Sequence, residues 1–234
     1  RMRGSCSFRE IVARRSRKYR RSIRGLRAIS TEGQMEESLM VYLPPANSSA
    51  GTGATKYTGA VAAGYDAKRE QSPKWICEQR IIEQWIDEMP EGSVILDAPC
   101  GTGRFFPAYE RNKHLVLGLD ISPDMIAQAK AKITQPNLFK FGVGDVRQVP
   151  LEDKTVDFAI NCRITRWLSP EDNVLMMKEM QRVARKGIIW TARIAHHPHA
   201  RSRELFESAL DGWKIERDAI GYELPYRIFM AVPA

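Results

Sequence analysis

The sequence predicts an α/β domain in which a mostly parallel sheet is covered by helices. Three observations predict this class: short apolar runs rich in β-branched residues alternate with helical patterns, the first three runs lead into aspartates, and the last two runs form a hairpin. The chain has 234 residues, which is enough for one large α/β domain with extra segments at one end.

The first strand is expected over 93–96, where the sequence "SVIL" is apolar and β-branched. Asp97 ends this strand, and a helix is expected to begin near Gly103. Gly101 and Gly103 match the first pair of a dinucleotide fingerprint, but Phe106 replaces its third glycine, and the Lys-Ser/Thr pair of a Walker loop is missing. Because Asp97 would repel a diphosphate and attract an amino group, the turn predicts a ligand with a cationic or donor-rich end and no phosphate.

The other elements follow from the same patterns. Ser122 and Pro123 are a good N-cap and first residue for a helix that follows the second strand. Two more helices are expected over 73–89 and over 170–184, the second with methionines that we assign to the core. The later strands are expected over 114–120, twice within 138–160, and over 187–194, 213–220 and 226–232, the last two as an antiparallel hairpin.

The stretch "ILDAPCGTGRF", residues 95–105, resembles motif I of the class I SAM-dependent methyltransferases, an acid followed by GxGxG. The resemblance runs from about 65 to 232 and points to the "methyltransferase type 11" and ubiquinone/menaquinone methyltransferase-like group. It implies a Rossmann-like three-layer sandwich with a seven-stranded, mostly parallel sheet, in the order 3-2-1-4-5-7-6 and with an antiparallel last strand. Pro99 replaces the first glycine of the motif, so we expect an ordinary φ and no donor there.

The resemblance implies that S-adenosylmethionine is the cofactor and S-adenosylhomocysteine (SAH) its product. Asp120 would accept hydrogen bonds from the ribose hydroxyls, and Ile121 or Met125 would pack against the adenine. Asp145 would accept from the adenine amino group, and the Val146 N–H would donate to the ring. The full set of expected cofactor residues is Tyr65, Asp97, Pro99, Cys100, Gly101, Gly103, Asp120, Ile121, Met125, Asp145, Val146 and Asn161.

The end of the fourth strand is expected to face the transferred methyl group. Asn161 is present there, but the prolines and the aromatic residue of the amino-group methyltransferases are missing, and Cys162 is expected to be a core or loop cysteine. Arg163 and Trp167 would share a face if this turn is helical. Arg163 then either holds a carboxylate or phosphate of the substrate, or pairs with a surface acid.

A histidine-rich loop, "AHHPHARSR", follows the fifth strand. We expect it to face the substrate, and His197 to be a candidate general base. A metal site is not expected, because no carboxylate lies near these histidines. The resemblance therefore predicts an enzyme that moves a methyl group by in-line displacement to a small-molecule or lipid-like acceptor. Two alternatives stay open: an RNA or protein methyltransferase recruited through a basic arm, and a SAM-binding subunit without activity.

The positive charge of the chain is concentrated at its beginning. Residues 1–31 hold eleven Lys/Arg and one Glu, whereas the rest holds 25 basic and 27 acidic residues, so only this arm is expected to contact nucleic acid or anionic membrane. The arm could be a transit peptide, a nucleic-acid arm, a lipid-surface helix or a solvated, non-native extension. We divide the chain into this arm (1–34), a linker or lid segment (35–64) and the methyltransferase domain (65–234).

Four scattered cysteines and the lack of an apolar run of eighteen residues predict a reduced, intracellular protein without a membrane span. A cytoplasmic location is expected, or an organelle if the arm is a transit peptide.

Overall fold

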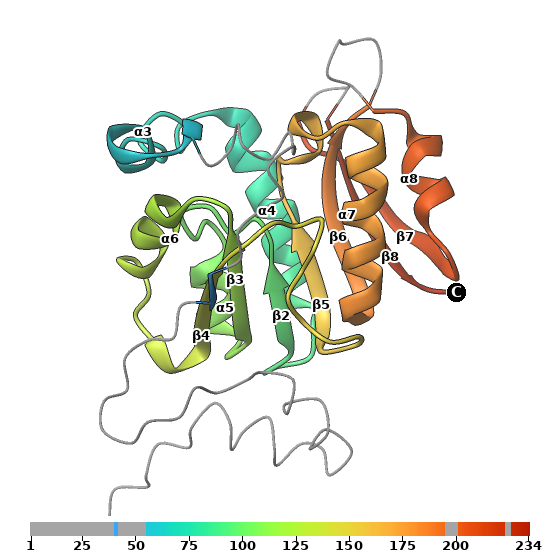
Figure 1. Cartoon of the computed structure of the whole chain (residues 1–234), viewed down its shortest axis with the longest axis horizontal. Helices are drawn as coiled ribbons and strands as arrows, with labels where there is room; N and C mark the ends of the chain where they lie inside the picture. The colour runs from blue at the N-terminus through green and yellow to red at the C-terminus, as the bar shows by residue number, and fades with distance from the viewer. Residues whose placement is uncertain (1–39, 42–54, 195–200, 223–225) are drawn as a thin grey trace, which may run out of the picture.

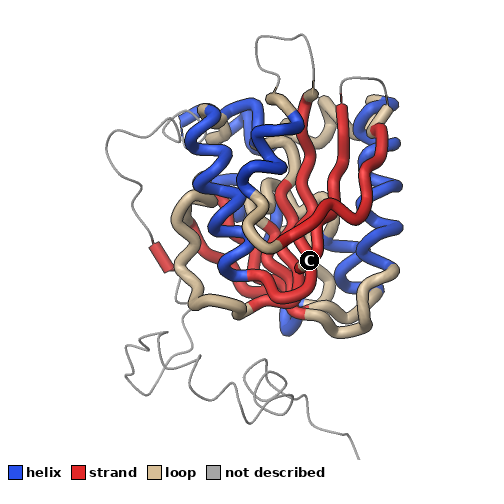
Figure 2. The backbone as a smooth tube through the Cα atoms, turned by 90° about the vertical axis from the view of Figure 1, so that its right-hand side faces the viewer, coloured by secondary structure: helices blue, strands red, loops and turns tan. Residues whose placement is uncertain are grey.

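The computed structural model describes residues 40–41, 55–194, 201–222 and 226–234. These residues form an eight-stranded sheet between two layers of helices (Figures 1 and 2). The strands are β1 (Met40–Val41), β2 (Val94–Asp97), β3 (Leu115–Asp120), β4 (Phe139–Val143), β5 (Val156–Asn161), β6 (Ala184–Arg193), β7 (Trp213–Ile220) and β8 (Tyr226–Pro233). The helices are α3 (Gly59–Ala63), α4 (Pro73–Asp87), α5 (Phe106–Arg111), α6 (Pro123–Lys130), α7 (Pro170–Val183) and α8 (Arg203–Ala209), with 3-10 turns η2 (Pro136–Leu138) and η3 (Thr165–Trp167).

The strand order is β1-β4-β3-β2-β5-β6-β8-β7. Without β1, this is the predicted order 3-2-1-4-5-7-6, and β8 is antiparallel to both β6 and β7 as the hairpin prediction required. The Rossmann-like three-layer fold is therefore confirmed. The two-residue β1 adds a parallel edge strand, which pairs Met40 with Gly142 and which the sequence did not predict.

Each face of the sheet packs against its own group of helices, because residues alternate in direction along a strand. Ile95 of β2 belongs to the core cluster that includes residues of α4, α5 and α6. Its neighbour Leu96 belongs to the opposite cluster, which includes residues of α7 and α8. Met176, Met177 and Met180 of α7 are almost completely buried, as the assignment of these methionines to the core predicts.

The helix ends follow local capping chemistry. The Ser122 side chain accepts a hydrogen bond from the Met125 N–H at the start of α6, and Pro123 is the first helical residue, as predicted. Most predicted boundaries differ from the observed ones by no more than two residues, and two differ by about three. The helix after β2 begins at Phe106 rather than near Gly103, and β6 begins at Ala184 because that residue is already extended. Among the described residues, no helix is both long and apolar enough to cross a bilayer.

Candidate functional site

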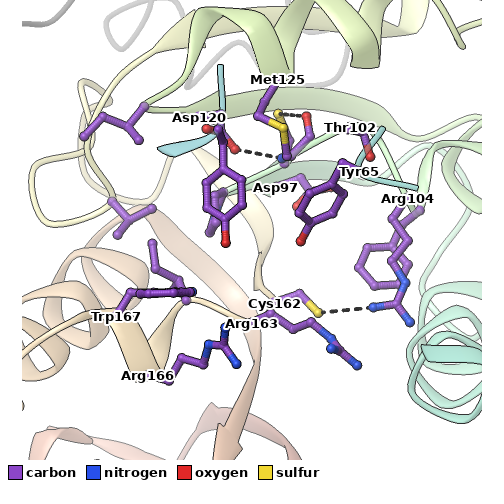
Figure 3. A pocket seen from close by; sticks show the side chains of 18 of the residues that line it. Tyr65, Asp97, Thr102, Arg104, Asp120, Met125, Cys162, Arg163, Arg166 and Trp167 are labelled. Carbon is purple, nitrogen blue, oxygen red and sulfur yellow. Dashed lines mark hydrogen bonds between the residues drawn. The ribbon is translucent and has the colours of Figure 1, made fainter. Parts of the chain in front are cut away.

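A cavity of about 300 Å³ lies at the carboxyl ends of β2, β3, β4 and β5. Strand β2 is the point from which the chain proceeds to β3 and β4 on one side and to β5 and β6 on the other. Open α/β sheets bind ligands at this switch point, because strand ends and loops diverge there. The cavity is lined by most of the residues that the sequence singled out (Figure 3).

Ten of the twelve expected cofactor residues line the cavity. Three of them are the acids Asp97, Asp120 and Asp145; the others are Tyr65, Pro99, Cys100, Gly101, Ile121, Met125 and Val146. Gly103 and Asn161 are not among the lining residues. Asn161 is fully buried, and its Nδ2 donates to the carbonyl of Ala98 at 2.9 Å, so it holds the turn that follows β2.

Asp97 is a buried carboxyl that has one hydrogen-bond donor among the residues that the structure describes. Its side chain is 1% exposed, and the Tyr109 hydroxyl donates to Oδ2 at 3.2 Å. Burial raises the pKa of Asp97 to about 8, while the hydrogen bond from Tyr109 lowers it. A cation placed beside Asp97 would favour its ionised form, so this carboxyl suits an ammonium group.

Asp120 organises the glycine turn. The Gly101 N–H donates to Oδ2 and the Ser122 N–H to Oδ1, both at 2.9 Å. Burial raises the pKa of Asp120 to about 6, although these backbone donors lower it. A carboxylate has about four acceptor sites, so these bonds to the backbone leave acceptor capacity for hydroxyl donors of a ligand.

Asp145 already has a partner within the protein, which the sequence did not predict. The Arg147 side chain already donates to both of its oxygens, with Nη2 at 2.5 Å from Oδ2 and Nε at 3.0 Å from Oδ1. The role expected for Asp145 toward an adenine amino group stays a prediction. Arg147 also pairs with Asp172 at 3.0 Å and so links this loop to the first turn of α7.

The glycines of the turn have different tasks. Gly101 has φ +55°, and an added Cβ would meet only Met125 Cε at 3.6 Å, so the space beside it belongs to the cavity. Gly103 has φ +78°, and an added Cβ would lie 2.6 Å from the ring of Phe106. Phe106 thus fills the place of the third fingerprint glycine and packs into the core against Phe139. The peptide bond between Ala98 and Pro99 is cis.

A segment before the first central strand borders the cavity. Tyr57, Tyr65, Arg69 and Trp75 line it. Asp66 fastens this segment to the glycine turn, because the Thr102 hydroxyl donates to its Oδ1 at 2.6 Å. Tyr65, one of the predicted cofactor residues, belongs to this segment. Its ring centre lies 5.6 Å from that of Tyr57 and 6.2 Å from that of Trp75.

The substrate-facing predictions have mixed outcomes. Arg163 and Trp167 line the cavity, but they do not share a helical face, because Arg163 is left-handed with φ +64° and only 165–167 form a 3-10 turn. The partner of Arg163 is the buried Glu78, at 2.9 Å, rather than a surface acid. His197 lies outside the described residues, and its role as a base stays a prediction. Among the residues that the structure describes, no cluster suited to a metal ion is found.

Glu78 is the centre of a buried cluster that the sequence analysis missed. Its Oε1 accepts from Arg104 Nη1 at 2.7 Å, from Arg163 Nε at 2.9 Å and from the Cys162 thiol at 3.0 Å. Burial by itself raises the pKa of Glu78, but Arg163 and Arg104 bring it below the ordinary 4.5. Burial and Glu78 raise the pKa of Cys162, which favours the thiol over the thiolate.

The helix α4 contained a signal for this cluster. Its buried positions are Trp75, Glu78, Ile82, Trp85 and Ile86, so a carboxylate stands on the apolar stripe of the helix. A buried acid is almost always paired with a cation. The stripe therefore predicts a cationic partner for Glu78, although it does not say which one.

Comparisons with known proteins agree with this architecture. A family model described as a methyltransferase domain matches residues 96–190. A methyltransferase-like protein of Schizosaccharomyces pombe is 30% identical over 136 residues, which are 56% of this chain and 50% of that protein. The malonyl-[acyl-carrier protein] O-methyltransferase of Serratia marcescens is 32% identical over 96 residues, or 41% of this chain and 36% of that enzyme. The chain thus spans half or less of these relatives.

A solved structure shows the same fold over most of the chain. The magnesium protoporphyrin IX methyltransferase of Synechocystis PCC 6803, crystallised with bound SAH, superposes with a TM-score of 0.66 and 16% sequence identity. The match covers 80% of this chain and 100% of that one. At this identity the likeness concerns the fold, and the match of the family model concerns the stretch that contains the glycine turn and the three acids.

Proposed function

We propose that this chain, a member of the class I SAM-dependent methyltransferase superfamily, binds S-adenosylmethionine in the cavity and transfers its methyl group to a small-molecule or lipid-like acceptor. The observation that carries the proposal is the placement of Asp97 and Asp120 on either side of the glycine turn. Both carboxyls are buried, and both have pKa values raised by burial. Such groups favour a ligand that brings a positive charge and hydroxyl donors.

The lining residues fit this cofactor in three respects. Asp97 suits the amino group of its methionine part, because a cation stabilises a buried carboxylate. Asp120 keeps free acceptor sites for two ribose hydroxyls. Ile121, Met125 and Val146 supply apolar surface for the adenine. In the same proposal Asp145 accepts from the adenine amino group, and Tyr65, which also lines the cavity, borders the cofactor.

The chemistry asks little of the protein beyond binding and orientation. The sulfonium of the cofactor supplies an electrophilic methyl carbon, which forms a bond to the acceptor while the carbon–sulfur bond breaks and its electron pair stays on sulfur. The chain must hold the acceptor in line and exclude water, an effect worth about 7–11 kcal/mol in well-oriented systems. Trp75, Tyr65 and Trp167 border the space in which the acceptor would lie.

Calorimetry with SAH and with NAD tests the cofactor assignment. We expect SAH to bind and NAD to bind far more weakly, because the acids that line this end of the cavity, Asp120 among them, disfavour a diphosphate. Asp120→Ala should weaken SAH binding by about tenfold or more, since two charge-assisted hydrogen bonds are lost. Asp153→Ala is the matched control, because the Asp153 side chain is 75% exposed in a surface ion pair. Equal affinities for SAH and NAD, or an unchanged affinity in a folded Asp120→Ala protein, would reject the assignment.

A second assay separates an enzyme from a SAM-binding subunit without activity. Transfer of label from methyl-labelled S-adenosylmethionine to a metabolite extract is expected for the enzyme and not for the subunit. The remaining alternative, recruitment of RNA or protein through the basic arm, depends on residues 1–31, which lie outside the described residues. Deletion of that arm should leave labelling of a small molecule intact.

A further inference from the structure

The charged side chains that line the cavity are divided between its two ends. The acids Asp97, Asp120 and Asp145 stand at the ends of β2, β3 and β4. The loop after β5 carries Arg163 and Arg166 instead, and Figure 3 shows these arginines across the cavity from Asp120. The acidic end suits the cofactor in the proposed function. The end of the cavity that carries the arginines is then left for the methyl acceptor.

Glu78 neutralises part of the arginine end but not all of it. Its carboxylate is shared by Arg104 and Arg163, and among the described residues no second carboxylate lies within ion-pair distance of either guanidinium. Arg166 is exposed at the rim, with its guanidinium 4.4 Å from the ring centre of Trp167. Within the described part of the chain, Arg166 has no carboxylate within ion-pair distance.

A third arginine completes this group from the neighbouring strand. Arg193, at the end of β6, borders a recess of about 10 Å³ together with Arg163, Arg166 and Tyr226. That volume is about the space of one water-sized group. The Nε atom of Arg193 is buried without a hydrogen-bond partner in the described residues. A buried, charged donor without a partner is costly and calls for an acceptor that binds there.

Aromatic rings surround the same guanidinium groups. The Tyr226 ring lies 5.6 Å from the Arg163 guanidinium and 5.3 Å from that of Arg193. The Trp167 ring makes cation–π contacts with Arg166 and with Lys56, whose Nζ lies 4.1 Å from the ring centre. Guanidinium groups held against rings keep their edges free for bidentate binding of a carboxylate or phosphate. The rings themselves offer apolar surface to the body of the same molecule.

We propose that Arg166 and Arg193, with Arg163 beside them, form an anion subsite, and that the methyl acceptor is an apolar molecule bearing a carboxylate or phosphate. This inference rests on the proposed function, since it assigns the part of the cavity that the cofactor leaves. The two anions share the chemistry that the guanidinium groups recognise. Glu78 is a positioning residue in this arrangement, because it holds Arg163 Nε and leaves the remaining nitrogens of that side chain for a ligand.

Three rigid probes test the subsite: 2-naphthoate, 2-naphthyl phosphate and the neutral 2-naphthamide, each titrated by calorimetry with and without saturating SAH. We expect at least one of the two anions to bind at least about tenfold more tightly than the amide. The tighter anion identifies the group that the acceptor carries. Arg166→Gln and Arg193→Gln should each remove most of that preference and leave SAH affinity and amide affinity within about twofold.

The controls keep the outcome decisive. Arg111→Gln removes an arginine whose side chain is 51% exposed and paired with Asp87, away from the cavity, and should leave the preference unchanged. Arg166 is exposed, so its variant tests the subsite even if Arg193→Gln fails to fold. Equal binding of anions and amide, no binding by any probe at millimolar concentration, or unaltered preference in Arg166→Gln would overturn the subsite. Failure of SAH to bind would instead reject the proposed function, while the titration without SAH still decides the subsite.

Discussion

Replacing Glu78 by Gln would test whether the buried cluster holds the arginines beside the cavity. Glu78 is 2% exposed, and one of its oxygens receives guanidinium donors at 2.7 and 2.9 Å. Glutamine keeps the size and one acceptor oxygen but leaves two guanidinium groups without a counter-charge. Breaking one buried pair in this way costs about 3–5 kcal/mol of unfolding free energy. We expect Glu78→Gln to lose about 3 kcal/mol, the lower limit, because its amide oxygen still accepts.

Urea denaturation at several pH values measures this loss. Glu91→Gln is the control, because Glu91 pairs with Lys113 at the surface and such pairs contribute about 0–1 kcal/mol. The arginines lower the pKa of Glu78 below the ordinary 4.5, so its stabilisation is present above that value and is lost as the pH falls through the lower, folded-state pKa. The difference in unfolding free energy between the unaltered protein and Glu78→Gln should therefore become smaller in acid. Equal losses in Glu78→Gln and Glu91→Gln would refute the argument.

Two other predictions concern the glycine turn. Burial raises the pKa of Asp97 to about 8 from an ordinary 3.8, so the native state binds the extra proton between these values and loses stability as the pH rises through them. Asp97→Asn should therefore gain stability relative to the unaltered protein between pH 5 and pH 8, about 1.4 kcal/mol per pH unit at most, and a pH-independent difference in thermal melts would exclude a titrating Asp97. Gly103→Ala should lose about 2–4 kcal/mol of unfolding free energy for two reasons. The new Cβ would lie 2.6 Å from the Phe106 ring, and alanine would have to adopt the left-handed φ of this glycine. Gly212→Ala shares the left-handed φ and has open space, so it should lose only about 1–2 kcal/mol, and equal losses in the two variants would show that the ring yields.

Much of the fold could be predicted because its signals are local. The strands β2, β3 and β5 are buried on both faces and therefore read as short, continuous apolar runs. The cap of α6 consists of two adjacent residues, Ser122 and Pro123. The strand order came from the resemblance of the glycine turn rather than from these runs. The two-residue β1 is too short to have any periodic signal.

The missed parts of the site are long-range contacts. Glu78 is separated in sequence from Arg104 by 26 residues and from Arg163 by 85. The local sequence of neither arginine indicates that Glu78 is its partner. The helical turn on which a shared face of Arg163 and Trp167 depends does not form after β5. Arg163 is left-handed, a conformation that is uncommon for residues other than glycine and that tertiary contacts hold here. The hydrogen bond from the Arg163 N–H to the Thr191 hydroxyl, at 2.8 Å, is one such contact.

The three acids were found for a different reason. Asp97 and Asp120 end strands, and Asp145 follows closely after one, so the parallel sheet brings all three to the same edge. Their carboxyl groups line one cavity, as predicted. The sequence could not reveal that Arg147 engages Asp145, because the pair depends on the bend of the loop that joins them.

A crystal structure of the chain with bound SAH would test the assignment of the cavity to S-adenosylmethionine. We expect SAH in the cavity at the ends of β2 to β5, with its ribose hydroxyls within hydrogen-bond distance of Asp120 and its amino group beside Asp97. Its sulfur should face the space bordered by Arg163 and Trp167. SAH bound elsewhere, or bound in the cavity with its ribose directed toward the arginines, would contradict the account.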